Sequence, residues 1–226
     1  RATGAAMVPV PLRPESGFRM AAADVAARIT PRTRAILLTT PHNPTGAILT
    51  RADIAALGRL AVEHDLWIIS DEVYEDLVFE ASEFVSPLSD PDLAERVVAV
   101  SSISKSHAAP GFRSGWCIGS LEFTAHLLAL SETMLFGNQP FIADMTEQAV
   151  REGSDVAAGM RGRFAARAEL LAKRLERETA LRVHRPEAGM FAMVDIAATG
   201  LNGESYAFDL LEKTGVAVMP GASFGK

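Results

Sequence analysis

The stretch that decides the fold runs from residue 34 to residue 46 and reads RAILLTTPHNPTG. Its first half, Arg34 to Thr40, is a short apolar run that is typical of a buried β-strand. Its second half, Pro41 to Gly46, consists of residues that favour turns, so the strand should end there. Thr50 and Asp53 then have the spacing of a capping box, which predicts that a helix follows directly.

The same alternation of apolar strand and helix continues along the chain. Further buried strands are expected at residues 66–70, 96–101 and 114–119. Uninterrupted apolar runs separated by helices are typical of a mainly parallel sheet that is covered on both faces. Trp67 and Trp116 lie in two of these runs and are expected in the core. The sequence therefore predicts an α/β fold with three layers.

The C-terminal part of the chain predicts a long helix and then a smaller unit. Helical patterns span residues 121–130 and 139–150, and residues 156–178 suit one long helix with Met160, Phe164, Leu171 and Leu175 inward. A strand at 190–196, a helix at 205–213 and a strand at 216–218 should form a smaller α+β unit. The predicted organisation is a larger domain over 1–150, a connecting helix over 151–180 and part of a smaller domain over 181–226.

Composition favours a globular protein with a small-molecule partner. The chain has 226 residues, of which 48% are hydrophobic, enough for a sizeable core. The net charge of −6 is spread along the chain without a Lys or Arg block, so neither nucleic acid nor a membrane surface is an expected partner. The single cysteine, Cys117, is expected to be buried in a reducing compartment, which favours the cytoplasm. His42, His64 and His107 lack ligand partners at suitable spacing, so no metal is expected.

Polar side chains follow three of the predicted strands. Asn43 follows the first, Asp71 the second, and the segment from Ser102 to Lys105 the third. Ligands of open parallel α/β sheets bind outside the carboxyl ends of the strands. We therefore expect these polar residues to meet at one edge of the sheet and to form a ligand site.

Three motifs carry a resemblance to a known family. PHNPTG (41–46), SDEVY (70–74) and SISKSHAAPGFRSGW (102–116) are similar to class I/II aminotransferases, which are fold-type I pyridoxal-5′-phosphate (PLP) enzymes of the aspartate aminotransferase superfamily. The motifs have the family's order, and the separations of 28 residues from Asn43 to Asp71 and of 8 from Lys105 to Arg113 also match. The resemblance implies the large domain of a PLP transferase followed by part of its smaller C-terminal domain.

The resemblance assigns the central chemistry to Lys105 and Asp71. Lys105 matches the lysine that forms the Schiff base with the cofactor, for which its amine must lose its proton. Asp71 matches the carboxylate that keeps the pyridine nitrogen protonated, so that the ring accepts electrons. The plainer alternatives are an exposed lysine and an aspartate that caps a helix.

Four further residues match cofactor ligands of the family. Asn43 and Tyr74 correspond to the partners of the phenolic oxygen, with Tyr74 counted as catalytic, and Ser102 and Arg113 correspond to phosphate ligands. The alternatives are a turn asparagine for Asn43 and a surface ion pair for Arg113. The family's asparagine–proline bond is often cis, so we expect a cis bond between Asn43 and Pro44.

The implied reaction moves an amino group from an amino acid to a 2-oxo acid through a Schiff base on Lys105, as in amino-acid metabolism. The stretches at 64–74 and 104–116 are similar to arginine–pyruvate transaminases in particular. The family implies a homodimer, and segments ahead of Arg1 and after Lys226 that complete the phosphate and substrate-carboxylate sites. Two alternatives stay open: another PLP enzyme such as a carbon–sulfur lyase, and the aminotransferase-like effector domain of a transcription regulator.

Overall fold

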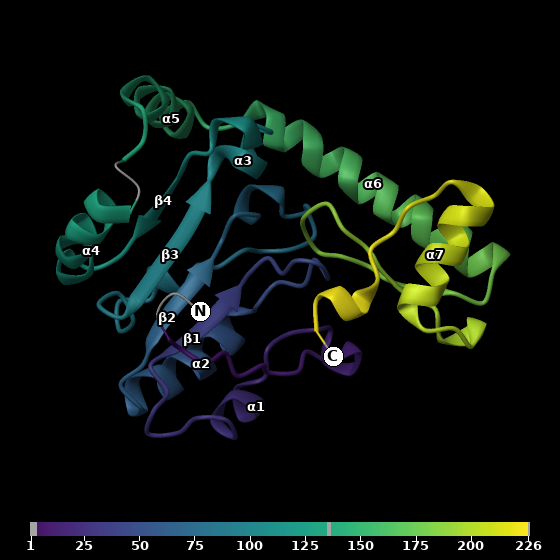
Figure 1. The fold of residues 1–226 in the computed structure, drawn as a ribbon, viewed down its shortest axis with the longest axis horizontal. Coiled ribbons are helices and arrows are strands. Elements are labelled where there is room, and N and C mark those ends of the chain that lie inside the picture. Colours follow the sequence, from purple (N-terminus) through teal and green to yellow (C-terminus); the bar gives the residue numbers. More distant parts are fainter. Residues whose placement is uncertain (1–3, 135–136, 226) are drawn as a thin grey trace.

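A four-stranded sheet forms the centre of the larger unit (Figure 1). The computed structural model describes residues 4–134 and 137–225. The sheet order is β1-β2-β3-β4, with β1 to β3 parallel and β4 antiparallel to β3. The strands are β1 (Ala35–Thr39), β2 (Trp67–Asp71), β3 (Val97–Ser102) and β4 (Gly115–Ile118). The predicted strands are therefore confirmed to within a residue or two at each end.

Helices connect the strands and continue beyond β4. They are α1 (Ala22–Ala26), α2 (Arg51–Glu63), α3 (Ile103–Ser106), α4 (Leu121–Met134), α5 (Pro140–Glu152), α6 (Asp155–Glu178) and α7 (Gly203–Thr214). Single 3-10 turns lie at Pro14–Ser16, Glu75–Leu77, Pro87–Ser89, Pro110–Phe112, Ala197–Thr199 and Gly221–Ser223. The capping box is confirmed: Thr50 Oγ1 accepts from Asp53 N at 3.1 Å, and Asp53 Oδ2 accepts from Thr50 N at 2.9 Å.

One face of the sheet carries the main hydrophobic core. Ile36 and Leu38 of β1 alternate with exposed neighbours and point to this face, as Ile68 does in β2. Leu57 of α2 is completely buried against them, and α2 covers the face. The apolar side chains that alternate along the strands and those on one face of α2 thus pack together in one apolar layer.

The opposite face is only partly covered by the described residues. Leu37 and Ile69 lie side by side on it and are 48% and 36% exposed. Trp67 was expected in the core, but it is 37% exposed because it belongs to this face, where its ring contacts Phe123 of α4 with 5.9 Å between ring centroids. Figure 1 shows α4 lying beside β4 rather than across the whole face.

Strand β4 differs from the expected buried strand. It has β3 as its partner on one side, so it is an edge strand among the described residues. Its burial is accordingly incomplete: Trp116 and Cys117 are half-buried, and Ile118 is exposed. The expectation that both residues belong to the core is therefore wrong for this position.

The smaller unit follows the long helix α6 (Figure 1). It contains α7 and a two-stranded antiparallel sheet of β5 (Arg182–His184) and β6 (Met193–Asp195). The sequence does not predict β5, and the strand expected at 216–218 is wrong: these residues are exposed and pair with no strand among the described residues. Leu171 of α6 is likewise 41% exposed rather than inward.

The segment before β6 packs back on the larger unit. Glu187 N donates to Gly46 O at 3.0 Å, and Gly189 N donates to Leu77 O at 2.9 Å. The turn at 41–46 therefore has a long-range partner. In the part of the chain that the structure describes, no helix has both the length and the apolar character to cross a membrane.

Candidate active site

The parallel strands bring the predicted polar residues to one edge of the sheet. Thr39 pairs with Asp71, and Asp71 pairs with Val100, so β1, β2 and β3 end at almost the same level. Asn43 lies in the turn after β1, and Ser102 ends β3. Residues that are far apart in sequence therefore meet at the carboxyl edge, as expected.

Asn43 and Tyr74 are in contact at this edge. Asn43 Nδ2 donates to the Tyr74 hydroxyl oxygen at 3.5 Å, a long hydrogen bond. Asn43 Oδ1 is buried and has no hydrogen-bond partner among the described residues. A buried amide that leaves one polar atom unpaired is prepared for a further partner. The peptide bond between Asn43 and Pro44 is cis, which confirms that prediction.

Lys105 reaches the same group from β3. It lies in the single-turn helix α3, which begins with Ser102 as its cap, where Ser102 Oγ accepts from Ser104 N at 3.3 Å. The Lys105 side chain is half-buried, and its Nζ lies 5.9 Å from the centroid of the Tyr74 ring. The amine therefore faces the aromatic ring whose hydroxyl group contacts Asn43.

Tyr74 is the most buried member of the cluster. Its ring packs edge-on against Phe191, with 5.5 Å between centroids. Burial raises the pKa of its phenol, the negative charge of Asp71 raises it further, and the hydrogen bond from Asn43 opposes both effects. Asp71 Oδ1 also accepts from Val73 N at 3.2 Å, which fixes the carboxylate. Asp71 is therefore close enough to Tyr74 to act on it electrostatically.

Arg113 is placed differently. It is exposed, it adopts the left-handed backbone conformation with φ of 52°, and its Nη1 donates to Pro110 O at 2.9 Å. Its guanidinium thus bonds within its own turn rather than with Asn43, Asp71, Tyr74 or Lys105. A role for Arg113 as a phosphate ligand stays a prediction.

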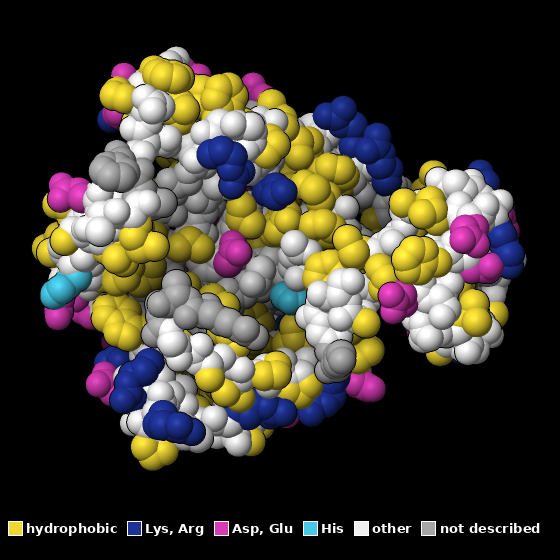
Figure 2. All heavy atoms as spheres, viewed as in Figure 1, with side chains coloured by type: hydrophobic (Ala, Val, Ile, Leu, Met, Phe, Trp, Pro, Cys, Tyr) yellow, Lys and Arg dark blue, Asp and Glu magenta, His cyan; other side chains and the backbone are white. Residues whose placement is uncertain are grey.

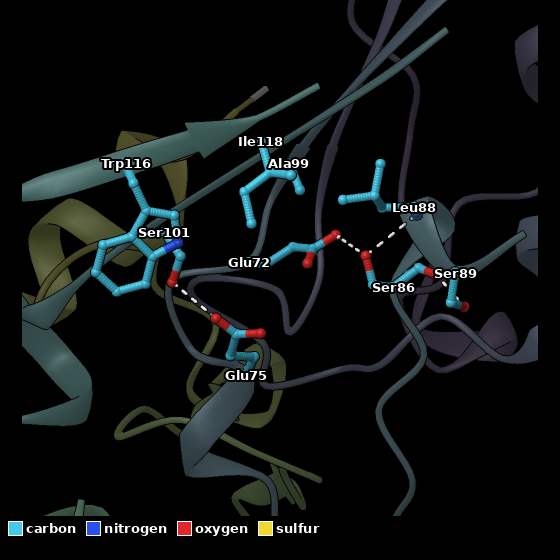
Figure 3. Close-up of a pocket in the computed structure, with 9 residues that line it drawn as sticks. All are labelled: Glu72, Glu75, Ser86, Leu88, Ser89, Ala99, Ser101, Trp116 and Ile118. Carbon is cyan, nitrogen blue, oxygen red and sulfur yellow. Dashed lines mark hydrogen bonds between the residues drawn. The ribbon is translucent and has the colours of Figure 1, made fainter. Parts of the chain in front are cut away.

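Glu72 of the SDEVY motif and Glu75 also line a pocket (Figure 3). Ala99, which lines it too, lies on the strand face opposite to that of Asp71, because Asp71 pairs with Val100. Ser86 Oγ donates to Glu72 Oε1 at 2.8 Å, and Ser101 Oγ donates to Glu75 Oε1 at 2.9 Å. Burial raises the pKa of both carboxyl groups, and these hydrogen bonds partly oppose the shift. Sequence reasoning missed these two residues, although both lie in or next to the motif.

The described residues contain no group of three or more His, Cys, Asp and Glu side chains that could hold a metal ion. The space-filling view shows hydrophobic side chains over much of the face that Figure 1 presents, with Lys and Arg mainly at its margins (Figure 2). The arrangement at the carboxyl edge is a small polar cluster of one amine, one carboxylate, one phenol and one amide, with the Tyr74 ring packed against Phe191.

Comparison with known proteins gives the family. The family model described as aminotransferase class I and II matches residues 1–226. The arginine–pyruvate transaminase AruH of Pseudomonas aeruginosa is 47% identical over 224 residues, which are 99% of this chain and 57% of that protein. The aromatic-amino-acid aminotransferase 2 of Thermococcus litoralis is 32% identical over 99% of this chain and 58% of that protein. The chain thus spans somewhat more than half the length of these relatives.

Solved structures agree with the sequence matches. An aromatic aminotransferase from Pyrococcus horikoshii superimposes with a TM-score of 0.91 and 30% identity, over 97% of this chain and 59% of that chain. An aspartate aminotransferase double mutant from Thermus thermophilus gives a TM-score of 0.87 and 33% identity, over 96% and 56%. These structures confirm the expected fold class, a PLP-transferase fold of fold type I. The chain belongs to the class I and II aminotransferase family.

Proposed function

We propose that this chain is the larger part of a PLP-dependent aminotransferase that moves an amino group from an amino acid to a 2-oxo acid. The observation that carries the proposal is the approach of Lys105 Nζ to the Tyr74 ring, 5.9 Å from its centroid, beside the contact between Tyr74 and Asn43. These three groups suit an aromatic aldehyde with a phenolic oxygen: the amine can react with the aldehyde, and the phenol and the amide can hydrogen-bond to the oxygen. The family match supports the same reading.

The residues present fit the cofactor. The amide of Asn43 has a buried atom without a partner, and Tyr74 lies beside it with its hydroxyl group, so together they offer a polar pair for the phenolic oxygen. Asp71 is positioned by Val73 N and supplies negative charge for the ring nitrogen. When bound, PLP supplies a ring that accepts electrons from the substrate α-carbon.

Lys105 holds the reactive position in this proposal. As a nucleophilic amine, Lys105 would hold the cofactor through its aldehyde group, with loss of water. As a base, the same amine would move a proton to or from the substrate α-carbon. Its position beside Tyr74 rather than in open solvent keeps its proton transfers directed to one place.

Ser102 and Arg113 bind the phosphate of the cofactor in this proposal. Ser102 Oγ accepts one hydrogen bond, from Ser104 N, and its hydroxyl proton remains to be donated to a phosphate oxygen. Arg113 is eight residues beyond Lys105 in the family motif, and its exposed guanidinium has donors beyond the one used for Pro110 O.

We also propose the domain organisation and the partners. Residues 1–150 form part of the cofactor-binding domain, 151–180 the connecting helix, and 181–226 part of the smaller domain; α6 and the separate sheet of β5 and β6 support this division. By family membership the protein acts on a small amino acid and a 2-oxo acid as a homodimer. The unpaired Cys117 supports a cytoplasmic location.

A visible spectrum of the purified full-length protein tests the cofactor. PLP bound through Lys105 absorbs at wavelengths above the protein band, and this absorbance should be lost in Lys105→Ala and retained in Lys213→Ala, a surface lysine paired with Asp209. Reduction with borohydride followed by peptide mapping should place the cofactor mass on residue 105. A spectrum that Lys105→Ala leaves unchanged would refute the assignment.

The similarity to AruH suggests arginine and pyruvate as the first substrates to test. A panel of amino donors with pyruvate should give alanine and the matching 2-oxo acid in equal amounts. Turnover of other donors without arginine would remove that specific proposal and keep the transaminase. Pyruvate and ammonia released without an acceptor would indicate a lyase instead.

A further inference from the structure

His107 links the lysine-bearing turn to a distant part of the chain. Its Nε2 lies 3.1 Å from Ala149 O and 3.2 Å from Gly153 O, and its Nδ1 lies 2.9 Å from Ser106 Oγ. Carbonyl oxygens only accept hydrogen bonds, so Nε2 must carry the proton. Ser106 Oγ also donates to Ser102 O at 3.3 Å, so either Ser106 or His107 can be the donor in the bond between them. The contacts therefore fix a proton on Nε2 and leave the direction of the Ser106 bond open.

The carbonyl oxygens that His107 contacts lie at the end of α5. Ala149 is in the last turn of that helix, and Gly153 is its cap with φ of 73°. Ala149 O also accepts from Gly153 N at 3.1 Å, so His107 Nε2 is a further donor at this end of the helix, where the helix dipole favours one. His107 thus connects the C-terminal end of α5 to Ser106.

A second contact holds the same serine from its other side. Ser154 Oγ donates to Ser106 O at 2.5 Å and accepts from Ala157 N at 3.0 Å as the cap of α6. Ser106 is buried and is the residue directly after Lys105. Its side chain and its carbonyl group are thereby tied to the junction between α5 and α6. We call the contacts of Ser106 and His107 with 149–154 the α5–α6 clasp.

The clasp is one of the tertiary contacts that hold the turn of Lys105. A one-turn helix such as α3 has too few internal hydrogen bonds to be rigid alone, so its position depends on tertiary contacts. Helix α6 starts at the clasp and runs to the smaller unit, where it packs against β5. A displacement at the start of α6 would therefore be transmitted to the backbone of Ser106 and to the lysine beside it.

We propose that His107 is a positioning residue for Lys105: through the α5–α6 clasp it fixes the turn that carries the amine and couples it to the helix that leads to the smaller unit. This inference rests on the proposed function of Lys105. His107 touches neither Asn43 nor Tyr74 in the structure, so its effect is exerted through the backbone. The side chains and the donors that carry the clasp are all on this chain.

Two substitutions at His107 separate its two bonds. Gln places its amide near the position of Nε2 and can donate to the α5 carbonyls, whereas Asn reaches only the position of Nδ1 and can accept from Ser106. Because small displacements of a reacting group lower rates by up to about a hundredfold, we expect His107→Ala to lower kcat by about ten- to a hundredfold with KM within about twofold. His107→Gln should recover more of kcat than His107→Asn. His126→Ala is the matched control, since His126 contacts Glu122 O of its own exposed helix.

A readout besides activity is the pH titration of the visible absorbance in the full-length protein with PLP bound. Displacement of Lys105 should shift its midpoint in His107→Ala, and amide hydrogen exchange of residues 102–107 should be faster, while His126→Ala matches the wild type. At the second arm of the clasp, Ser154→Asp keeps a cap acceptor for α6 but has no proton for Ser106 O, and Ser154→Asn keeps both. Faster amide hydrogen exchange in Ser154→Asp than in Ser154→Asn supports the clasp even where His107→Ala fails to fold.

If His107→Ala shows the same pH titration, hydrogen exchange and kcat as the wild type, the proposed role of the clasp is overturned and the proposed function stays intact. Recovery by Asn that equals or exceeds recovery by Gln would also overturn it, since the α5 bond would then be dispensable. A wild-type protein without any PLP absorbance is a separate result: it refutes the role of Lys105 itself and with it this inference.

Discussion

Replacing Gly46 by alanine should destabilise the protein through the turn that holds Asn43. Gly46 has φ of +72°, in the left-handed region, and a Cβ built on it lies 2.4 Å from Pro186 Cβ and 2.6 Å from Ala188 O. Its N donates to His42 O at 2.7 Å, and its O accepts from Glu187 N at 3.0 Å. A shift of the turn that relieves the added methyl group would therefore weaken a hydrogen bond within the turn or the one that joins the turn to residue 187.

The magnitude follows from two costs. A residue with a Cβ in the left-handed conformation loses about 1–2 kcal/mol, and overpacking at a close contact costs about 1–3 kcal/mol. The free energy of unfolding should thus fall by about 2–5 kcal/mol, which corresponds to a decrease in Tm of about 4–20 °C for a domain of this size. Affinity for PLP should fall as well, because Asn43 lies in the displaced turn.

Urea and thermal unfolding followed by circular dichroism measure this change. The control is Gly162→Ala in the exposed part of α6, where a Cβ meets no atom within 4 Å and the helix should gain up to about 1 kcal/mol. The two variants should therefore shift Tm in opposite directions. Equal stability of Gly46→Ala and the wild type would refute the close packing between the turn and 186–188.

Three further changes test the core, the pocket of Glu72 and the cofactor cluster. Leu57→Ala, at a side chain with no exposure, should cost about 2–5 kcal/mol of unfolding free energy in urea titration, against less than about 0.5 kcal/mol for the exposed Leu170. Burial raises the pKa of Glu72 above the ordinary 4.5, so the folded state binds its proton more tightly, and the free energy of unfolding should fall as pH rises through the window above 4.5. Glu72→Gln should flatten this dependence when unfolding is measured from pH 4 to 8. An unchanged slope would contradict the prediction. Tyr74→Phe keeps the packing on Phe191 and should weaken PLP binding about tenfold or more in equilibrium dialysis, as expected for loss of a hydrogen bond to a charged oxygen; unaltered affinity would exclude that bond.

The elements with a clear local pattern of residues could be predicted from the sequence. The strand at 35–39, the capping box of Thr50 and the turn at 41–46 each have such a pattern, although the strand and the turn also have distant partners, and the structure confirms them. Asn43, Asp71 and the segment 102–105 were expected at one edge of the sheet, and the register of β1, β2 and β3 places the ends of these strands together whatever lies between them. The roles of these residues stay predictions.

The remaining features depend on partners that are distant in the sequence. Strand β5 has three residues, too few for a period of two to show, and it forms by pairing with β6 across a loop. The exposure of Trp67 depends on what covers its face of the sheet, which an apolar run does not reveal. An edge position such as that of β4 also follows from sheet order and not from composition.

The same distinction applies inside the site. The motifs identify which side chains are present, but the distances among them depend on long-range contacts: Gly46 against 186–188 for the turn of Asn43, and His107 and Ser154 against Ser106 for the turn of Lys105. The first contact comes from the segment between β5 and β6 of the smaller unit, and the second from the junction at the start of α6, which leads to that unit. If that unit shifted relative to the sheet, Asn43 and Lys105 would move together, one through each contact. The geometry of the cluster should therefore respond to substitutions in 149–154 and 186–188 that touch none of its members.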